Sequence, residues 1–341
     1  MGIKKRNKGL HEGVRMGKEL ISVLDNFKGK KILVIGDIML DKSIWGDVTR
    51  ISPEAPVQVV NVDKETYAPG GAANTANNIS ALGGDVSVVG VVGNDSAREK
   101  LLEELRKKKI NTEGIVVSEE RPTIQKIRVM GKGQQLLRVD YEDDSEISKD
   151  VRGKIFDKIK KIIDSVDAII ISDYAKGIVT KALFYDIMRI AANKIIVVDP
   201  KTKYAIHYKG VTLVTPNNYE AGVMANIEIK NKEDLVKAGK KLLESLQSNI
   251  LITRGEKGMS LFEKDGNITE IETKAKEVYD VTGAGDTVVA VATIAMASGA
   301  SVKDAALLAN YAAGIVVGKL GTATVSISEL KKAIEEDEKD S

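Results

Sequence analysis

Residues 280–300 read DVTGAGDTVVAVATIAMASGA, and the interpretation of the whole chain starts from this stretch. The run from Thr287 onward has the length and composition of a buried helix. Backbone N–H groups at a helix start lack intrahelical partners, and the helix dipole favours negative charge there. The stretch therefore predicts a cradle for an anion such as phosphate, because small residues let the anion approach the backbone closely. The cradle would consist of Gly283, Ala284 and Gly285.

Asp286 lies in the first turn of this predicted helix, beside the cradle. A carboxylate there can accept a proton from an attacking hydroxyl while the amides stabilise charge on a phosphoryl group. Those are the two requirements of phosphoryl transfer. The alternative is an acidic residue that only stabilises the helix start, and spacing alone does not separate the two.

Strands and helices alternate along most of the chain. The sequence predicts strands at Lys31–Gly36, Val86–Val92, Ala168–Ser172, Lys194–Val198, Thr212–Val214 and Ile250–Thr253. It predicts helices at Ala72–Leu82, Ser96–Lys108, Lys149–Ile163, Lys181–Ala192 and Lys232–Leu246. This alternation predicts an α/β fold, with a mostly parallel central sheet flanked by helices.

Two regions interrupt the alternation, at residues 43–62 and 123–140. Their apolar residues alternate with polar ones, as in strands with one buried face. We expect a small β-sheet lid over a site at the edge of the main domain; the alternative is two decorative hairpins. Since an exposed β-surface tends to pair, the lid is also the expected contact of a homodimer. The remaining regions are a basic tail and short helix at 1–29, the α/β domain at 30–330 and a charged tail at 331–341.

Composition excludes several classes of protein. The 341 residues include no cysteine and two histidines, which argues against disulfides, thiol nucleophiles and Cys/His metal clusters. Any metal is expected to be a hard cation held by oxygen, such as Mg²⁺. The net charge of +2 gives no indication of nucleic-acid binding. No apolar run reaches the roughly 18 residues of a membrane helix. We therefore expect a cytoplasmic protein that contacts no membrane.

Other polar residues stand where a ligand is expected. The glycine pair Gly70-Gly71 and Asn74 lead into the first long helix, and Asp37 follows the first strand at the edge where ligands of open α/β sheets bind. Asp37 could instead serve a turn or cap. Asn217 and Glu220 could bind Mg²⁺ through water or could cap a helix. The chain has neither a G-x-x-x-x-G-K-[ST] loop nor a dinucleotide G-x-G-x-x-G opening a helix.

These segments together resemble a known family. PGGAAN at 69–74 and DVTGAGD at 280–286, with Asn217–Glu220 and the Thr253–Gly255 turn, resemble the motifs of ribokinase-like (phosphofructokinase-B group) carbohydrate kinases over residues 30–330. The resemblance implies the ribokinase-like three-layer fold and an ATP-dependent phosphotransferase with an alcohol acceptor.

Further segments resemble the kinase half of heptose-7-phosphate kinase/heptose-1-phosphate adenylyltransferases. They are residues 36–60, the hairpin at 125–140, SDYAKG at 172–177 and VVGKLGTATVS at 316–326. This implies phosphorylation of the anomeric hydroxyl of D-glycero-D-manno-heptose 7-phosphate to the 1,7-bisphosphate. Ala72 and Ala73 stand where ribokinase usually carries a lysine, which favours heptose over ribose. Because the chain ends at Ser341, we expect the kinase step only.

The resemblance also implies roles for individual residues. Asp286 would be the general base, with Gly283, Ala284 and Gly285 as the anion hole. The sugar would be held by Asp37, Gly70, Gly71 and Asn74. ATP and Mg²⁺ would be organised by Asn217 and Glu220, and the nucleotide site would be lined by Thr253, Gly255 and Asn310. Asp280 and Thr282 would place a monovalent cation (K⁺), as in some relatives.

The substrate's own phosphate needs a cationic partner. Arg50 and Lys176 are the first candidates because each lies in a closely matching segment, and Arg128 and Arg138 on the lid hairpin follow. Each could instead form a solvated or structural ion pair. Two other functions stay open: a kinase of another sugar, sugar phosphate or nucleoside, and a sugar sensor without catalysis.

Overall fold

The computed structural model describes residues 17–191, 193–201 and 207–340. The strands of its central sheet are β1 (Lys31–Gly36), β4 (Asp85–Gly93), β5 (Asn111–Ser118), β8 (Ala168–Ser172), β9 (Ile195–Asp199), β10 (Leu213–Val214), β11 (Asn249–Thr253), β12 (Met259–Phe262) and β13 (Ile268–Ile271). They follow the order β13-β12-β11-β10-β9-β8-β1-β4-β5. All pairs from β11 to β5 are parallel, whereas β12 and β13 are antiparallel. The predicted mostly parallel α/β fold is confirmed.

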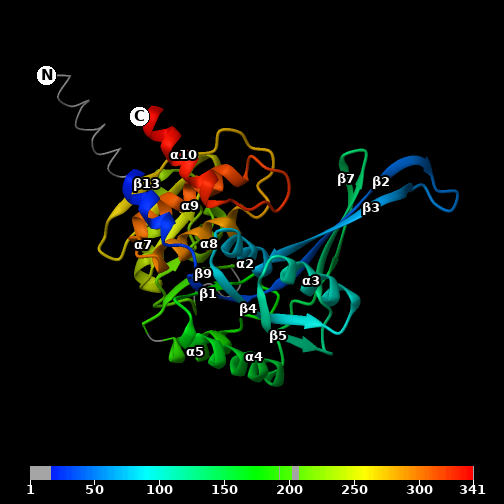
Figure 1. Cartoon of the computed structure of the whole chain (residues 1–341), viewed down its shortest axis with the longest axis horizontal. Coiled ribbons are helices and arrows are strands. Elements are labelled where there is room, and N and C mark those ends of the chain that lie inside the picture. Colours follow the sequence, from blue (N-terminus) through cyan, green and yellow to red (C-terminus); the bar gives the residue numbers. More distant parts are fainter. Residues whose placement is uncertain (1–16, 192, 202–206, 341) are drawn as a thin grey trace.

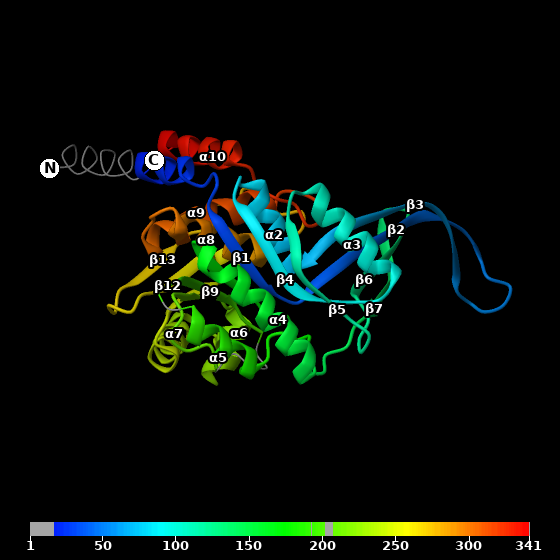
Figure 2. The same cartoon turned by 60° about the horizontal axis from the view of Figure 1, so that its bottom comes forward.

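Helices cover both faces of the sheet (Figures 1 and 2). One face carries α2 (Ala72–Ala81), α3 (Ser96–Lys107), α8 (Ala284–Ala297) and α9 (Val302–Val316). The other carries α4 (Lys149–Ile162), α5 (Lys181–Ile190), α6 (Asn218–Ala225) and α7 (Lys232–Leu246). Successive side chains of a strand point to opposite faces, so Ile32 and Val34 of β1 join one core while Leu33 and Ile35 join the other. These two cores make the molecule three-layered.

Helix α8 lies deepest in the helical layer. Its side chains are buried from Asp286 to Met296, as expected of a helix that is apolar on all sides. Tyr174 follows the carboxyl end of β8 and donates to Asp286 at 2.8 Å, which places the start of α8 at that edge of the sheet.

The predicted lid is a second, four-stranded sheet. Its strands are β2 (Ile38–Ile51), β3 (Gln58–Gly71), β6 (Ile124–Gly131) and β7 (Gln134–Tyr141), in the order β3-β2-β6-β7. The strands β2 and β3 extend beyond the predicted 43–62 segment, because β2 begins and β3 ends at the core itself. Figure 1 shows their outer ends projecting away from the α/β body.

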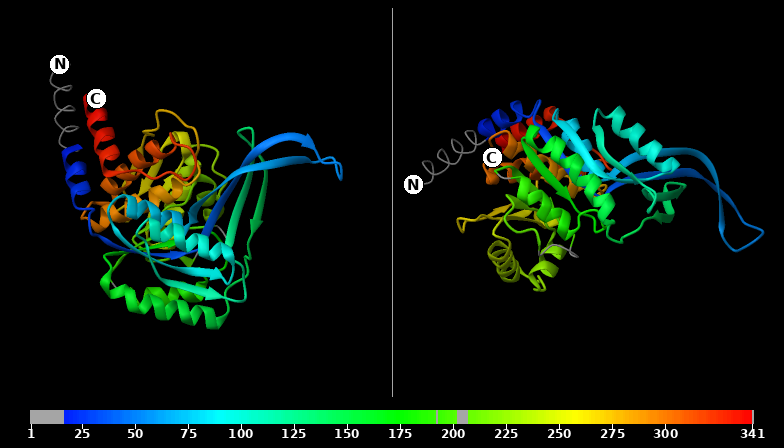
Figure 3. Two further views of the ribbon diagram at one scale, coloured as in Figure 1. Left: turned by 45° about the vertical axis from the view of Figure 1, so that its right-hand side comes forward. Right: turned by 90° about the horizontal axis from the view of Figure 1, so that it is seen from below.

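The two ends of the described chain pack together. Residues 17–25 are helical and lie beside α10 (Ile327–Asp340), where Lys331 pairs with Asp25 at 2.6 Å (Figure 3). Ile334 is 1 % exposed, so α10 belongs to the folded domain and the predicted charged tail from residue 331 was wrong. In the part of the chain that the structure describes, no helix has the length and apolar character needed to cross a membrane.

Candidate active site

The first turn of α8 carries the predicted anion cradle. Gly283 is the N-cap residue and has a φ of 80°, in the left-handed region that favours glycine. The N–H of Ala284 donates to the carbonyl of Val281 at 3.2 Å, which leaves the later amides of the turn for a ligand. A Cβ added to Gly285 would meet no atom within 4 Å, so the space there is open. This geometry fits an approaching phosphoryl group.

Asp286 is 3 % exposed and receives three side-chain hydrogen bonds. Asn74 Nδ2 donates to Oδ2 at 2.7 Å, and Tyr174 and Thr75 donate their hydroxyls to Oδ1 at 2.8 and 3.1 Å. Burial raises the pKa of Asp286, while the three donors and the charge of Lys201 oppose the shift. The donors hold the carboxylate in one orientation, as a proton acceptor at a fixed point requires.

The glycine pair packs the lid against the first helix. A Cβ at Gly71, whose φ is 56°, would lie 2.4 Å from the carbonyl oxygen of Asp37, and one at Gly70 would lie 2.6 Å from Asp41 Oδ2. Gly71 therefore requires glycine for packing, whatever it does for a ligand, whereas the oxygen met at Gly70 is the end of a side chain that can shift. Asn74, three residues on, reaches Asp286, and its buried Oδ1 has no hydrogen-bond partner among the described residues. An unpaired buried oxygen beside Asp286 could accept a hydrogen bond from a hydroxyl group of a ligand.

Asp37 holds a loop. Its carboxylate accepts the backbone N–H groups of Tyr174, Lys176 and Ile178 at 2.7, 3.2 and 3.3 Å, and its side chain is fully buried. Burial raises the pKa of Asp37 to about 6. The structure favours the turn-anchoring alternative, since the carboxylate is already engaged by three amides. Contact between Asp37 and a sugar stays a prediction.

Asn217 and Glu220 form a capping box at the start of α6. Each side chain accepts the other's backbone N–H, at 2.9 and 2.8 Å. Glu220 also pairs with Lys201 Nζ at 2.5 Å, and this nitrogen lies 5.2 Å from the ring centre of Tyr174. Capping is therefore one role of the pair. Binding of Mg²⁺ through water, the second role that the sequence left open, stays a prediction.

A cavity of about 520 Å³ begins at the cradle. Ala284 and Gly285 line it, as do the predicted nucleotide residues Thr253, Gly255 and Asn310. Most of its remaining lining is apolar, which suits the flat face of a nucleobase. Asn310 donates its amide to the carbonyl of Glu272 at 2.7 Å and so fixes the chain segment that closes one side.

Asp280 and Thr282 lie in the loop before α8. The Asp280 carboxylate accepts the N–H groups of Thr282 and Gly321 at 2.9 and 3.1 Å. Among the described residues, no group of three or more His, Asp or Glu side chains could hold a metal ion by itself. A monovalent cation at Asp280 and Thr282 stays a prediction, and ligands from phosphate and water would be needed.

The structure separates the two first candidates for the substrate's phosphate. Lys176 lies beside the Asp37 loop and pairs with Glu142 at 2.7 Å. Arg50 is exposed and pairs with Val59 near the outer ends of β2 and β3. It lies eleven positions along β2 from Met39, which pairs with Gly70 at the root of the lid. At about 3.3 Å per residue, Arg50 lies far from the cradle of its own chain.

Sequence reasoning missed four side chains of the site: Asp41, Thr75, Tyr174 and Lys201. Burial raises the pKa of Tyr174 well above its usual value, and the carboxylates of Asp286, Asp199 and Asp41 add to this. Burial also raises the pKa of Asp199 to about 7. A signal existed for Tyr174, which directly follows the strand-end residue Asp173 in SDYAKG.

Fold and site together define the class of protein. A buried carboxylate, an anion cradle and a nucleotide-sized cavity meet at one helix start, and residues 29–329 match the model of the pfkB family carbohydrate kinases. The chain belongs to this family, as the sequence predicted, and membership implies the use of ATP.

Relatives and solved structures agree with this assignment. The chain is 46% identical over 313 residues to the "Bifunctional protein HldE" of Desulfatibacillum aliphaticivorans, covering 91% of this chain and 64% of that protein. It is 47% identical over 301 residues to the protein of the same name from Geobacter sulfurreducens, covering 87% and 61%. The chain thus spans a little under two thirds of these relatives.

Two solved structures share the fold. Ribokinase from Arabidopsis thaliana, complexed with ribose and ATP, superposes with a TM-score of 0.69 at 18% identity, covering 92% of this chain and all of that one. Phosphofructokinase-2 from Escherichia coli, in complex with potassium, gives 0.73 at 17% identity, covering 90% and 99%. The predicted ribokinase-like fold is confirmed.

Proposed function

We propose that this chain transfers the γ-phosphoryl group of ATP to the anomeric hydroxyl of D-glycero-D-manno-heptose 7-phosphate, giving the 1,7-bisphosphate and ADP. One observation carries the reaction type: Asp286 stands in the first turn of α8, whose residues Ala284 and Gly285 also line the nucleotide cavity. Base, cradle and nucleotide are therefore contiguous. Similarity to the bifunctional relatives over nine tenths of this chain supports the choice of heptose.

The chain's own residues divide the work of an in-line transfer. Asp286 accepts the proton of the sugar hydroxyl while the hydroxyl oxygen forms a bond to the γ-phosphorus. The bond between that phosphorus and the ADP oxygen breaks in the same step. The amides of the α8 start stabilise the negative charge on the transferring group. Asn74, Thr75 and Tyr174 keep the carboxylate oriented.

ATP is used with a divalent cation in this proposal. Mg²⁺ would neutralise phosphate charge, and Asn217 and Glu220 supply the oxygen atoms that would hold it through water. Lys201, paired with Glu220 and lying over Tyr174, is positioned to balance the negative charge of the same region.

The test is ATP consumption, followed by coupled ADP release, on a panel of heptose 7-phosphate, ribose, fructose 6-phosphate and adenosine. We expect strong preference for heptose 7-phosphate. Preference for another member would overturn the substrate while keeping the reaction type. Binding of sugar without turnover of ATP would favour the sensor.

A homodimer through the lid is proposed separately. Large apolar side chains are exposed on the lid: Ile51, Val57, Val62, Leu136 and Leu137. Exposed apolar area of this kind marks contact surfaces. Size-exclusion chromatography with light scattering should give twice the chain mass, and Leu137→Lys should shift it toward the monomer. A monomeric wild type would contradict this proposal.

A further inference from the structure

Two arginines stand directly opposite each other in the lid. Arg128 of β6 and Arg138 of β7 form a cross-strand pair, so their side chains share one face of the sheet. Like charges in such a pair repel and destabilise the sheet. The arrangement needs a reason, and an anion bound between the two guanidinium groups would supply one.

This face of the lid looks toward the base. Arg128 Nη1 donates to Asp41 Oδ1 at 2.6 Å, and Asp41 lies against Gly70 at the root of the lid. Asp280 lies in the loop before the cradle. Burial acts to raise its pKa, but hydrogen bonds from Thr282 and Gly321, and then the charge of Arg128, lower the pKa overall. Arg128 therefore contacts the root of the lid through Asp41.

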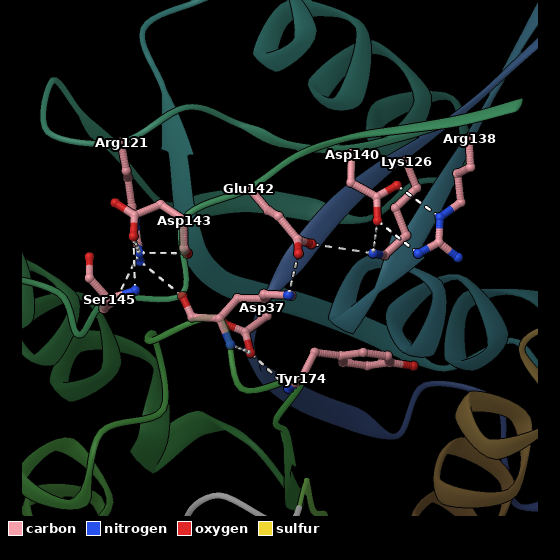
Figure 4. Close-up of polar contacts among 10 residues, drawn as sticks. Asp37, Arg121, Lys126, Arg138, Asp140, Glu142, Asp143, Ser145 and Tyr174 are labelled. Carbon is pink, nitrogen blue, oxygen red and sulfur yellow. Dashed lines mark hydrogen bonds and ion pairs between the residues drawn. The ribbon is translucent and has the colours of Figure 1, made fainter.

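A chain of ion pairs continues from Arg138. It binds Asp140 with two nitrogens at 3.0 and 2.9 Å, and Lys126 shares that carboxylate at 3.3 Å. Lys126 also reaches Glu142 at 3.4 Å. In Figure 4 Lys126, Asp140 and Arg138 lie together on the lid, above the loop that carries Tyr174. The Arg138 side chain is 53 % exposed, so an incoming anion can compete with Asp140 for its guanidinium group.

Positive charge exceeds negative charge in this cluster. Its cations are Lys126, Arg128, Arg138 and Lys176, and its carboxylates are Asp41, Asp140 and Glu142. Within this ion-paired set four cations thus face three carboxylates, and Asp280 is a fourth carboxylate close enough to be influenced by the charge of Arg128.

We propose that Arg128 and Arg138, assisted by Lys126, bind the phosphate that the sugar substrate already carries. The inference rests on the proposed function and adds the residues that select a phosphorylated sugar. The planar guanidinium fork matches phosphate oxygens in two parallel hydrogen bonds. In the sheet, Arg128 pairs with Ser43, which lies two residues along β2 from Asp41. Arg128 is therefore about 7 Å further than Asp41 from the root of the lid. The reacting hydroxyl and the phosphate lie at opposite ends of the sugar, so two separated sites are required.

The test compares two acceptors, heptose 7-phosphate and unphosphorylated heptose, in steady-state kinetics. Arg138→Gln is the first variant, because Asp140 keeps Lys126 as a partner and no buried charge is left alone. We expect KM for the sugar phosphate to rise ten- to hundredfold, the usual effect of losing hydrogen bonds between charged groups. KM for ATP should stay within about twofold. The preference for the phosphorylated over the unphosphorylated sugar should fall by the same ten- to hundredfold.

Two further variants separate binding from structure. Lys42 is a cation on the face of the lid opposite to Arg128, and it pairs with Glu65 at 2.8 Å. Lys42→Met should therefore leave the preference for the phosphorylated sugar unchanged. Arg138→Lys keeps the charge without the fork and should restore part of the preference. Thermal melting of each variant controls for loss of fold.

The outcomes separate the two proposals. If wild type prefers heptose 7-phosphate and Arg138→Gln keeps that preference, the phosphate site is wrong and the function stands. If wild type prefers another sugar phosphate and Arg138→Gln loses that preference, the site stands and the heptose assignment is wrong. Preference of wild type for an unphosphorylated sugar would overturn both.

Discussion

Replacing Asp286 by asparagine removes the proposed proton acceptor while keeping the shape of the side chain. The carboxylate is held by Asn74, Thr75 and Tyr174. Hydroxyl groups can rotate to donate or accept, and the Asn74 amide can turn to present its unpaired Oδ1. The pocket can therefore accommodate Asp286→Asn. We expect a loss of about 2–4 kcal/mol in transition-state stabilisation, which is roughly 30- to 900-fold in kcat at ~1.36 kcal/mol per decade.

The assay is coupled ADP release at saturating ATP and sugar, with sugar affinity measured separately by calorimetry. Sugar affinity should change little, because the loss belongs to the chemical step. Asp304→Asn is the matched control, since Asp304 occupies the first turn of the neighbouring helix α9 and should leave kcat near wild type. If Asp286→Asn also turns over at a near-normal rate, Asp286 only stabilises its helix and the mechanism is wrong.

Three further predictions follow from the same geometry. Gly283→Ala should cost about 1–2 kcal/mol of folding stability and most of kcat, because the φ of residue 283 is 80° and the new Cβ would lie 2.8 Å from Asn74 Nδ2. Equal melting temperatures for wild type and variant would contradict this prediction. Ala313→Phe should fill the cavity assigned to the nucleotide, so KM for ATP should rise at least tenfold while the affinity for the sugar stays the same. A KM for ATP equal to that of wild type would mean that the nucleotide does not bind in this cavity. The pKa of Asp37 is about 6 in the folded protein against an ordinary value of 3.8. Protonated Asp37 therefore makes its full contribution to folding stability below pH 4, and this contribution is lost as the pH rises through 6. Relative to Asp37→Asn, urea unfolding of wild type should therefore lose about 3 kcal/mol between pH 4 and 7, and parallel profiles would refute the shift.

Local pattern was sufficient for most elements. The apolar pattern placed α2, α3, α4 and α7 within a few residues of their observed ends, and all of these helices except α2 begin at a side-chain N-cap. The edge strand β5 and the hairpin of β12 and β13 were missed, because β5 opens with polar residues and β12 and β13 have only 4 residues each. The continuation of α10 to Asp340 was missed as well, since its charged residues mask the buried Leu330 and Ile334.

The site divides in a similar way. Asp286 and the glycine cradle could be predicted because one contiguous motif holds them. Tyr174 and Asn74 reach the same carboxylate from 112 and 212 residues away, and such pairing depends on the order of the strands. Asp37 and Asp41 are four residues apart, yet the first ends buried under a loop while the second enters the lid. Sequence spacing cannot distinguish them, since the change of sheet occurs between them.

The most direct test of the central claim is the position of the new phosphate. Purified protein, Mg·ATP and heptose 7-phosphate should give a product whose ³¹P spectrum shows the original phosphate and a second signal coupled to the anomeric proton. A second phosphate on any other carbon would contradict the proposed acceptor. Absence of a second phosphate, from folded protein that binds both substrates, would contradict the kinase assignment itself.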